Sequence, residues 1–414
     1  MKFSKTVIAA VAAATMIIPL AACGSGSAGS GKTTITYFSW NNEKMMTPIV
    51  QAFEKANPDI KVELSAAQGQ ANDYAQTLTT RAAGNQLPDV FHMSIETRNE
   101  VLDAGLARDI TDEDFVKNLP ASQTDLYTRD GKVYGMSPTA WVGGIVYNKD
   151  LLKQVGYDTV PDTLDEFIKL GKKLQAANIT PYMEDMSVVS GSFQPMLGGY
   201  YSKQGIDTSK WPEQDQGGTF SEQWTPVLEQ WMKLVDSGTL PKESVGVSAD
   251  NIKQNFMTGQ LAMFRSGPWD FADLDSSGVN YGVAAFPAVD GGKPYVGGGP
   301  DSPFVISSKI DGAKLEAAKK FLAFMNSADG LKLEEKYINQ ISVSPAYKAN
   351  VAPQLKDLYD QYITNGDFYW VNWTRSGTIM GQEMASQFQL LVQGQASVAD
   401  VTKDLDAKWA DNAK

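Results

Sequence analysis

The sequence is nearly without histidine and cysteine, since its 414 residues include one of each, His92 and Cys23. Catalysis of the Ser-His-Asp or Cys-His kind would need His92, which lies in the apolar run Phe91-His92-Met93. We therefore expect His92 to be a packed residue. Zinc sites built on His and Cys lack ligands here, and we expect neither a metal nor a cofactor.

Two further shortages limit the partners of the chain. Beyond the first 22 residues, no apolar run is long enough for a transmembrane helix. Basic residues are in deficit, because the formal net charge is −12 and falls to −14 when Lys2 and Lys5 leave with the N-terminal segment. This charge argues against nucleic acid and against electrostatic docking on anionic lipid. Any membrane contact should therefore be made through a lipid anchor.

The N-terminal segment predicts export and such an anchor. Lys2 and Lys5 precede a mostly apolar stretch at 7–20, and Leu20-Ala21-Ala22-Cys23 resembles a bacterial lipobox, whose cysteine is acylated. We expect 1–22 to be a signal peptide and 23–32 a lipidated N-terminus with a Gly/Ser linker. Cys23 would hold the protein on the outer face of the bacterial cell membrane. The alternative is an ordinary secretion signal with an incidental cysteine.

The linker contains letters that imitate a nucleotide site. Residues 26–33 fit the P-loop pattern. A working P-loop needs a strand before it and a helix after it, so that backbone amides can cradle phosphate. Here a signal peptide precedes the pattern and a β-rich run, 34–40, follows it, so nucleotide binding is not expected.

The remaining chain, about 380 residues, exceeds one comfortable core and favours two lobes. The run 34–40 alternates and predicts a strand, Thr47-Pro48 predicts the start of a helix, and 60–64 predicts a second strand. This β-α-β order implies a parallel, right-handed crossover. Farther along, Thr163 and Glu166 have the spacing of a capping box.

One stretch combines the signals of a buried strand and of a ligand site. Residues 261–264 form a short apolar run, and Ser266-Gly267-Pro268 then forces a turn before Trp269. A tryptophan at that place should lie at the carboxyl edge of the strand, where open α/β sheets bind ligands. The alternative is a core tryptophan that follows a turn.

Three stretches carry a family resemblance. The region 256–287, with its Gly-Pro-Trp turn, the run 53–62, and the motif Tyr147-Asn148-Lys149-Asp150-Leu151-Leu152 resemble maltose-binding proteins and other extracellular sugar-binding proteins of ABC importers. The resemblance covers almost the whole mature chain. It implies an α/β, two-lobed periplasmic-binding-protein-like fold of type II, with discontinuous lobes and three hinge crossovers.

The order of the segments places those crossovers near 139–144, 297–303 and 345–350. The N-lobe would then comprise 33–140 plus 302–345, and the C-lobe 144–297 plus 350–414. No internal repeat stands out.

The resemblance also implies site residues. In this family the Gly-Pro-Trp tryptophan, here Trp269, stacks on sugar, and the loop after the first strand contacts the ligand. Glu96 falls where maltose-binding proteins carry a ligand-binding aspartate, while Met93 replaces a stacking tryptophan and Trp141 a glutamate. Those two departures put maltose itself in doubt. The expected ligand-binding residues are Trp40, Asn41, Asn42, Glu43, Met93, Glu96, Trp141, Trp269, Trp373 and Arg375.

Each of these residues could instead belong to the core or the plain surface. Taken together, they favour sugar binding, because aromatic planes cover the C–H face of a pyranose while carboxylates, amides and Arg bind its hydroxyls. We expect a monomeric substrate-binding lipoprotein of an ABC importer that captures an oligosaccharide and delivers it to permease subunits. The alternatives are a same-fold binding protein for a non-sugar solute and a surface glycosidase, although no glycosidase motif emerges.

Overall fold

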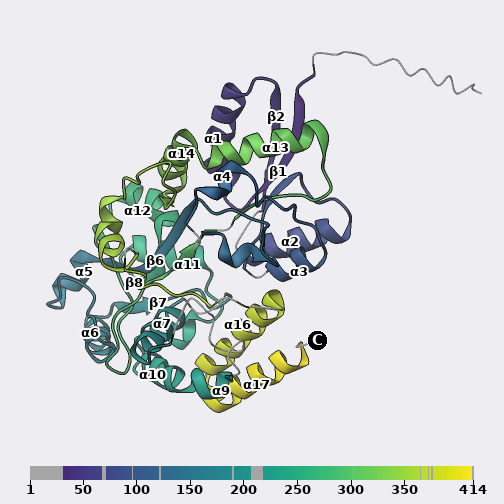
Figure 1. The fold of residues 1–414 in the computed structure, drawn as a ribbon. Helices are drawn as coiled ribbons and strands as arrows, with labels where there is room; N and C mark the ends of the chain where they lie inside the picture. Colours follow the sequence, from purple (N-terminus) through teal and green to yellow (C-terminus); the bar gives the residue numbers. More distant parts are fainter. Residues whose placement is uncertain are drawn as a thin grey trace, which may run out of the picture.

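The computed structural model describes residues 31–67, 71–95, 97–120, 123–188, 191–206, 218–301, 303–363, 365–371, 373 and 376–412, the side chains of 71–73 left aside. Cys23, the signal peptide and most of the linker lie outside the described residues, as do Glu96 and Arg375. Two larger sheets, each packed with helices, form an N-lobe and, below it in Figure 1, a C-lobe. The expected two-lobed α/β fold is confirmed.

The N-lobe is built on a four-stranded sheet in the order β11-β3-β1-β2. Its strands are β1 (Thr33–Ser39), β2 (Ile60–Ala66), β3 (Val90–His92) and β11 (Phe304–Ile306). β1 runs parallel to β2 and β3, and β11 lies antiparallel to β3. Helix α1 (Glu43–Ala56) connects β1 with β2 and confirms the expected β-α-β unit.

The start of α1 differs from the prediction. The helix begins at Glu43, and the side chain of Asn42 accepts a hydrogen bond from the Met45 backbone N–H at 3.0 Å. Pro48 lies inside the helix, and the Thr47 hydroxyl donates back to the Glu43 carbonyl at 2.6 Å. Asn42 therefore caps the helix five residues before Thr47, and the predicted start is wrong.

Helices and a small hairpin complete the N-lobe. They are α2 (Ala71–Ala83), α3 (Arg98–Asp103), α4 (Asp114–Lys117), α13 (Gly312–Met325), α14 (Ala328–Ile338), the turn η2 (Asp125–Tyr127), and the hairpin of β4 (Thr128–Arg129) with β5 (Lys132–Val133). Phe321 of α13 packs at ring-centroid distances of 5.1 Å from Tyr37 and 5.0 Å from Phe53. These contacts join β1, α1 and the returning segment into one core.

The C-lobe sheet follows the order β10-β6-β8-β7, and β9 and β12 also pair with β6. Its strands are β6 (Thr139–Asn148), β7 (Thr180–Met183), β8 (Leu261–Ser266), β9 (Tyr281–Ala284), β10 (Gly297–Pro300) and β12 (Ile341–Ser342). β7 runs parallel to β8, which itself lies antiparallel to β6. The strand predicted at 261–264 is thus present as β8.

The C-lobe helices cover this sheet, and several of them fill the lower part of Figure 1. They are α5 (Lys149–Gln154), α6 (Leu164–Ala176), α7 (Phe193–Lys203), α9 (Phe220–Gln223), α10 (Thr225–Asp236), α11 (Ala249–Met257), α12 (Phe271–Ser277), α15 (Lys356–Leu358), α16 (Gly377–Gln393) and α17 (Val398–Asp411). Short turns are η4 (Lys242–Ser244), η5 (Pro268–Asp270), η6 (Pro353–Leu355) and the π-helix η7 (Tyr359–Ile363).

Half of the predicted capping box is present at the start of α6. The Thr163 hydroxyl accepts from the Glu166 backbone N–H at 3.4 Å, as expected. The Glu166 carboxylate instead accepts a hydrogen bond from Lys169 at 2.5 Å. The ammonium group one turn along the helix competes for the carboxylate that should return to the cap.

Three segments connect the lobes. One is β6, and the other two, β10 and β12, pair with it. Gly297 to Pro300 pair with Gly143 to Ala140, while Ile341 and Ser342 pair with Ala140 and Thr139. Ile338 packs in the N-lobe core, whereas Ile341 packs in a C-lobe cluster. The third connection, expected near 345–350, stays a prediction. The lobe limits given above stay a prediction.

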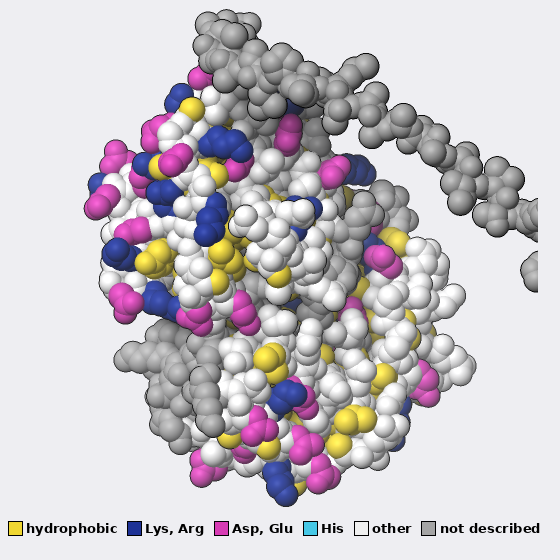
Figure 2. Space-filling view, turned by 90° about the vertical axis from the view of Figure 1, so that its right-hand side faces the viewer, with side chains coloured by type: hydrophobic (Ala, Val, Ile, Leu, Met, Phe, Trp, Pro, Cys, Tyr) yellow, Lys and Arg dark blue, Asp and Glu magenta, His cyan; other side chains and the backbone are white. Residues whose placement is uncertain are grey.

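Surface charge is mixed. Figure 2 shows acidic and basic side chains interspersed over one face, without a broad patch of one sign. Within the described residues, no helix is both long and apolar enough to cross a membrane.

Candidate functional site

A cavity of about 540 Å³ lies between the lobes. Residues from both lobes line it, and aromatic and polar side chains dominate. The lining residues on which the argument below depends are Trp40, Asn41, Tyr74, Tyr127, Trp141, Arg265, Trp269, Asp301, Gln340 and Trp370.

The C-lobe wall of this cavity is made of tryptophans. Trp141 comes from β6, Trp269 from the turn η5 after β8, and Trp370 from the segment before α16. The ring of Trp141 lies 6.3 Å from that of Trp269 and 5.1 Å from that of Trp370, the second pair edge to face. Trp269 is 38% exposed, an unusual value for a large apolar side chain in this protein. Part of this side chain is therefore accessible to a ligand.

Glycines explain how Trp269 comes to lie against the sheet. A Cβ added at Gly267 would stand 2.5 Å from the Trp269 ring, and one at Gly143 would stand 3.1 Å from it. The ring therefore packs on two positions that have no side chain, one within β6 and one directly after β8. At the next turn, the Ser266 hydroxyl donates to the Asp270 carboxylate at 2.5 Å, and Lys253 pairs with Asp270 at 3.0 Å. These bonds hold the backbone on both sides of Trp269.

Arg265 lies among the three tryptophans. Its guanidinium carbon is 5.0 Å from the centroid of Trp269, 5.2 Å from Trp370 and 5.8 Å from Trp141. These are cation–π distances. The side-chain stem crosses Gly191, where an added Cβ would clash at 2.7 Å. Burial lowers the pKa of the Arg265 guanidinium from its usual value, and nearby negative charge, including that of Glu184, offsets only part of this effect.

The N-lobe wall is more polar and carries three aromatic rings, those of Trp40, Tyr74 and Tyr127. Trp40 lies 5.0 Å from Tyr74 between ring centroids. The Tyr74 hydroxyl donates to the Phe38 carbonyl at 3.2 Å and accepts from the His92 backbone N–H at 2.8 Å. Burial raises the pKa of Tyr74 well above its usual range. Since this hydroxyl is committed to the backbone, Tyr74 offers the cavity its ring.

A carboxylate and an amide lie on the hinge side of the cavity. Gln340 donates from Nε2 to the Asp301 carboxylate at 2.6 Å. Asp301 follows β10 and Gln340 precedes β12, so both belong to segments that connect the lobes. A bound ligand would meet this pair beside the strands of the hinge.

Four of the expected ligand-binding residues line the cavity: Trp40, Asn41, Trp141 and Trp269. Three of them are tryptophans. Their role in binding stays a prediction.

Two neighbours of Asn41 have other positions. Asn42 caps α1, and Glu43 is exposed in the first turn of that helix. Met45 in the same turn lines the cavity but Asn42 and Glu43 do not, so the expectation that these two contact the ligand needs correction.

Met93 and Trp373 also need correction, because both are core residues. Met93 is fully buried in the N-lobe. Trp373 is 4% exposed and packs against Phe220, Trp224 and Trp409 at centroid distances of 6.0 to 6.4 Å. Glu96 and Arg375 lie outside the described residues.

Sequence reasoning missed Arg265, Tyr74, Asp301 and Gln340. A signal existed for Arg265, since a charge directly after a buried apolar run lies at the same strand edge as Trp269. Trp370 lines the cavity, whereas Trp373, which was expected there, does not. Nothing in the sequence distinguishes these two by spacing alone.

His92 is packed, as expected. It is 2% exposed, and its Nε2 lies 2.7 Å from the Tyr37 hydroxyl. Over the part of the chain that the structure describes, no group of three or more His, Cys, Asp or Glu residues is arranged to hold a metal ion.

The fold and the cavity define a two-lobed solute-binding protein. Residues 39–332 match the family described as bacterial extracellular solute-binding proteins, and the chain belongs to this family. A solved family 1 extracellular solute-binding protein from Bifidobacterium longum subsp. infantis is 42% identical, with a TM-score of 0.76, covering 92% of this chain and 100% of that one.

Two curated relatives carry more specific descriptions. The multiple sugar-binding protein of Streptococcus mutans is 27% identical over 332 residues, 76% of each chain. The maltooligosaccharide ABC transporter solute-binding lipoprotein of Streptococcus pneumoniae is 23% identical over 361 residues, covering 82% of this chain and 81% of the relative. Both are binding proteins.

Proposed function

We propose that this protein captures an oligosaccharide between its lobes as the substrate-binding component of an ABC importer. The observation that carries the proposal is the cavity itself, with the tryptophans 141, 269 and 370 on one wall and polar groups with Trp40 on the other. Flat aromatic faces suit the C–H faces of sugar rings, and amides, hydroxyls and Arg265 suit the hydroxyl rims. The descriptions of the curated relatives point to the same ligand class.

Closure of the lobes follows from this two-sided lining. A ligand that touches both walls binds the closed state better than the open state and therefore shifts the protein toward closure. The closed, loaded form would be the one that permease subunits recognise. We propose a monomer for this role.

Catalysis is not part of the proposal. A glycosidase needs two carboxylates on opposite sides of the scissile bond. Asp301 is the one carboxylate among the described residues of the cavity lining. A binding role, with no turnover of the sugar, accounts for this composition.

Calorimetry with a panel of solutes tests the function. We expect binding of at least one among raffinose, maltotriose, galacto-oligosaccharides and arabino-oligosaccharides, and none of free amino acids or short peptides. Chromatography after long incubation should return the sugar unchanged. Binding confined to a non-sugar solute would overturn the sugar assignment, and accumulation of shorter sugars would establish a glycosidase instead.

The anchor is tested separately. We propose that Cys23 is acylated after cleavage of the signal peptide and holds the protein on the outer face of the membrane. Cys23→Ala should release the protein from the membrane fraction or stall processing. An unmodified N-terminus in mass spectrometry, with unchanged fractionation of the variant, would contradict the anchor.

A further inference from the structure

Arg98 of the N-lobe makes a hydrogen bond to the C-lobe. It is the first residue of α3 and is 7% exposed. Its Nη1 donates to the Leu126 carbonyl in its own lobe at 3.1 Å, and its Nη2 donates to the Trp373 carbonyl at 2.8 Å. Arg98 and Trp373 are 275 residues apart in the chain. One planar guanidinium thus connects backbone from both lobes.

The two carbonyls adjoin the two walls of the cavity. Leu126 directly precedes Tyr127 of the N-lobe wall, and Trp373 follows Trp370 of the C-lobe wall by three residues. Arg98 is therefore placed where it can hold these walls together.

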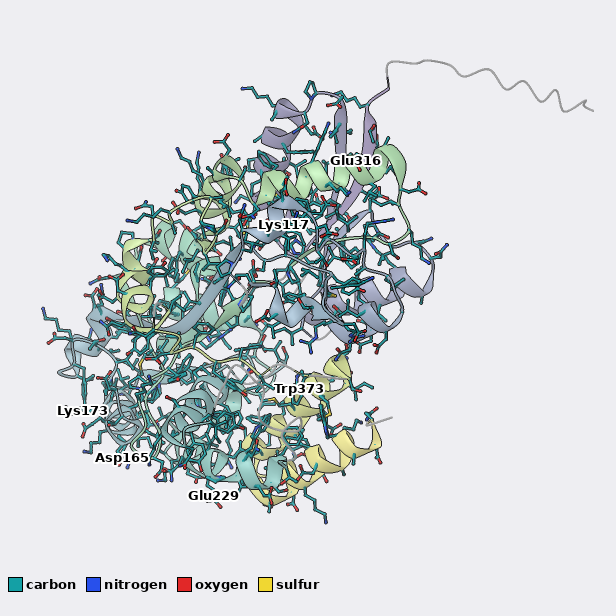
Figure 3. The ribbon with its side chains drawn as sticks, in the orientation of Figure 1. Lys117, Asp165, Lys173, Glu229, Glu316 and Trp373 are labelled. Carbon is teal, nitrogen blue, oxygen red and sulfur yellow. The ribbon has the colours of Figure 1, made fainter. Side chains whose placement is uncertain are left out.

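The C-lobe end of this contact is firmly held. The Trp373 ring packs between Trp224 and Trp409 in the core of the C-lobe. Figure 3 shows Trp373 beside α16 and below α3, away from β6. Separation of the lobes would thus break the bond from Arg98 to Trp373 rather than draw out a loose segment.

A second contact between the lobes differs in its position. Asn339 at the end of α14 donates from Nδ2 to the Pro268 carbonyl at 3.1 Å. Asn339 is two residues from β12, one of the strands on β6. Atoms close to a hinge move little when it opens, so the distance between Asn339 and Pro268 should differ little between the open and closed states. The contact of Arg98 lies off the hinge and changes with the distance between the lobes.

We propose that Arg98 is a clamp that stabilises the closed state through the Trp373 carbonyl; its effect on ligand affinity rests on the proposed function. The bond exists only when the lobes approach, so it favours closure before any ligand binds. Ligand and clamp then favour the same state, and the clamp raises affinity for every ligand by one common factor. Arg98 is thus a positioning residue, and the order of ligand preference belongs to other residues.

The distance between the lobes without ligand tests the clamp directly. In the Cys23→Ala chain, which has no other cysteine, Glu316→Cys on the N-lobe and Glu229→Cys on the C-lobe provide two sites for spin labels. Figure 3 shows both residues at the outer faces of their lobes. We expect Arg98→Gln to shift the distance distribution of the ligand-free protein toward longer values.

Arg129→Gln is the matched control. Arg129 pairs with Asp103 and donates to Asn99 at 3.2 Å, so it binds α3 without reaching the C-lobe. Its substitution should leave the distance distribution as in the parent. An unchanged distribution in Arg98→Gln, or an equal shift in Arg129→Gln, would overturn the clamp. This measurement needs no sugar and stands even if the sugar assignment fails.

In a second experiment, calorimetry tests whether the loss of Arg98 weakens the binding of every ligand by the same factor. Loss of a hydrogen bond from a charged donor corresponds to an affinity about tenfold to a hundredfold weaker. We expect Arg98→Gln to weaken binding of raffinose and of maltotriose, where the parent binds them, by the same factor, with the ratio of the two affinities unchanged. A loss confined to one sugar would overturn the clamp and make Arg98 a ligand-contact residue.

Discussion

The cavity tryptophans and the core tryptophans of the C-lobe use similar ring packing for different purposes. Trp141, Trp269 and Trp370 are spaced 5.1 to 6.3 Å apart where pairs are in contact, and Trp373 lies 6.1 Å from Trp224. The difference lies in what covers the outer faces. Trp224 and Trp231 are fully buried, and Trp231 donates from Nε1 to the Ser192 hydroxyl at 2.7 Å.

The residues against which the two sets of tryptophans pack also differ. Trp269 contacts Gly143 and Gly267 and is 38% exposed, and the Arg265 guanidinium lies 5.0 Å from its ring centroid. The core tryptophans Trp224, Trp231, Trp373 and Trp409 are buried among the side chains of one C-lobe core. Contact between aromatic rings is therefore a poor sign of a sugar site. A partly exposed ring that packs against glycines is a better sign of such a site.

The largest expected effect sharpens this comparison on the core side. Trp373→Ala should cost about 3–5 kcal/mol of folding stability, because it leaves a cavity in a packed core. Thermal unfolding should fall by several degrees or more, and any loss of sugar affinity should not exceed that of Arg98→Gln, because the ring supports the carbonyl that Arg98 binds. Calorimetry on the purified folded variant provides the check. A large loss of affinity with normal stability would return Trp373 to the site.

Trp269→Ala should give the opposite pattern. Truncation of a central aromatic anchor costs about 2 kcal/mol or more of binding energy, roughly thirtyfold in affinity. Stability should fall only slightly, since the ring is already 38% exposed. Trp269→Phe, which keeps a ring, should recover part of the affinity. Unchanged affinity with a large drop in unfolding temperature would make Trp269 a core residue.

Arg265→Gln tests whether the charge beside the tryptophans matters. The substitution removes cation–π contacts and a charged donor, and we expect roughly tenfold weaker sugar binding. Arg265→Lys should be intermediate, because an ammonium keeps the charge but loses the planar fork. Titrations of both variants against the parent decide the point, and equal affinity in all three would remove Arg265 from the site.

The smallest effect is expected on the opposite wall. Asn41→Ala removes an amide that lines the cavity, and a single neutral hydrogen bond is worth about 1 kcal/mol, roughly fivefold in affinity. Glu43→Ala is the control, since Glu43 is exposed beside it in the first turn of α1. A larger loss from Glu43→Ala than from Asn41→Ala would show that this wall is placed wrongly.

The sequence was sufficient for the fold class and for four of the residues that line the cavity. Alternation and turn chemistry located β1, β2 and β8, and the Gly-Pro turn located Trp269. Local signals fail where the outcome depends on distant partners. Trp370 and Trp373 lie three residues apart, yet one faces the cavity and the other enters a core formed by α9 and α17.

The same limit explains Met93 and the start of α1. Met93 aligns with a stacking position of the family, but the described structure encloses its side chain in the N-lobe core. Asn42 and Thr47 are both good caps by residue type. The choice between them depends on where β1 ends, at Ser39, and on where the chain can then begin a helix. Contacts such as Arg98 with Trp373 lie beyond any local pattern, because they join residues that only the complete fold brings together.

Protection of tryptophan fluorescence from acrylamide tests the central claim most directly. If an oligosaccharide covers the cavity tryptophans, saturation with the tightest-binding sugar of the panel should lower the quenching constant, because the core tryptophans are shielded already. The decrease should be smaller in Trp269→Ala at saturating sugar. A quenching constant that does not change, while calorimetry shows that the sugar is bound, would mean that the ligand lies elsewhere and would contradict the account.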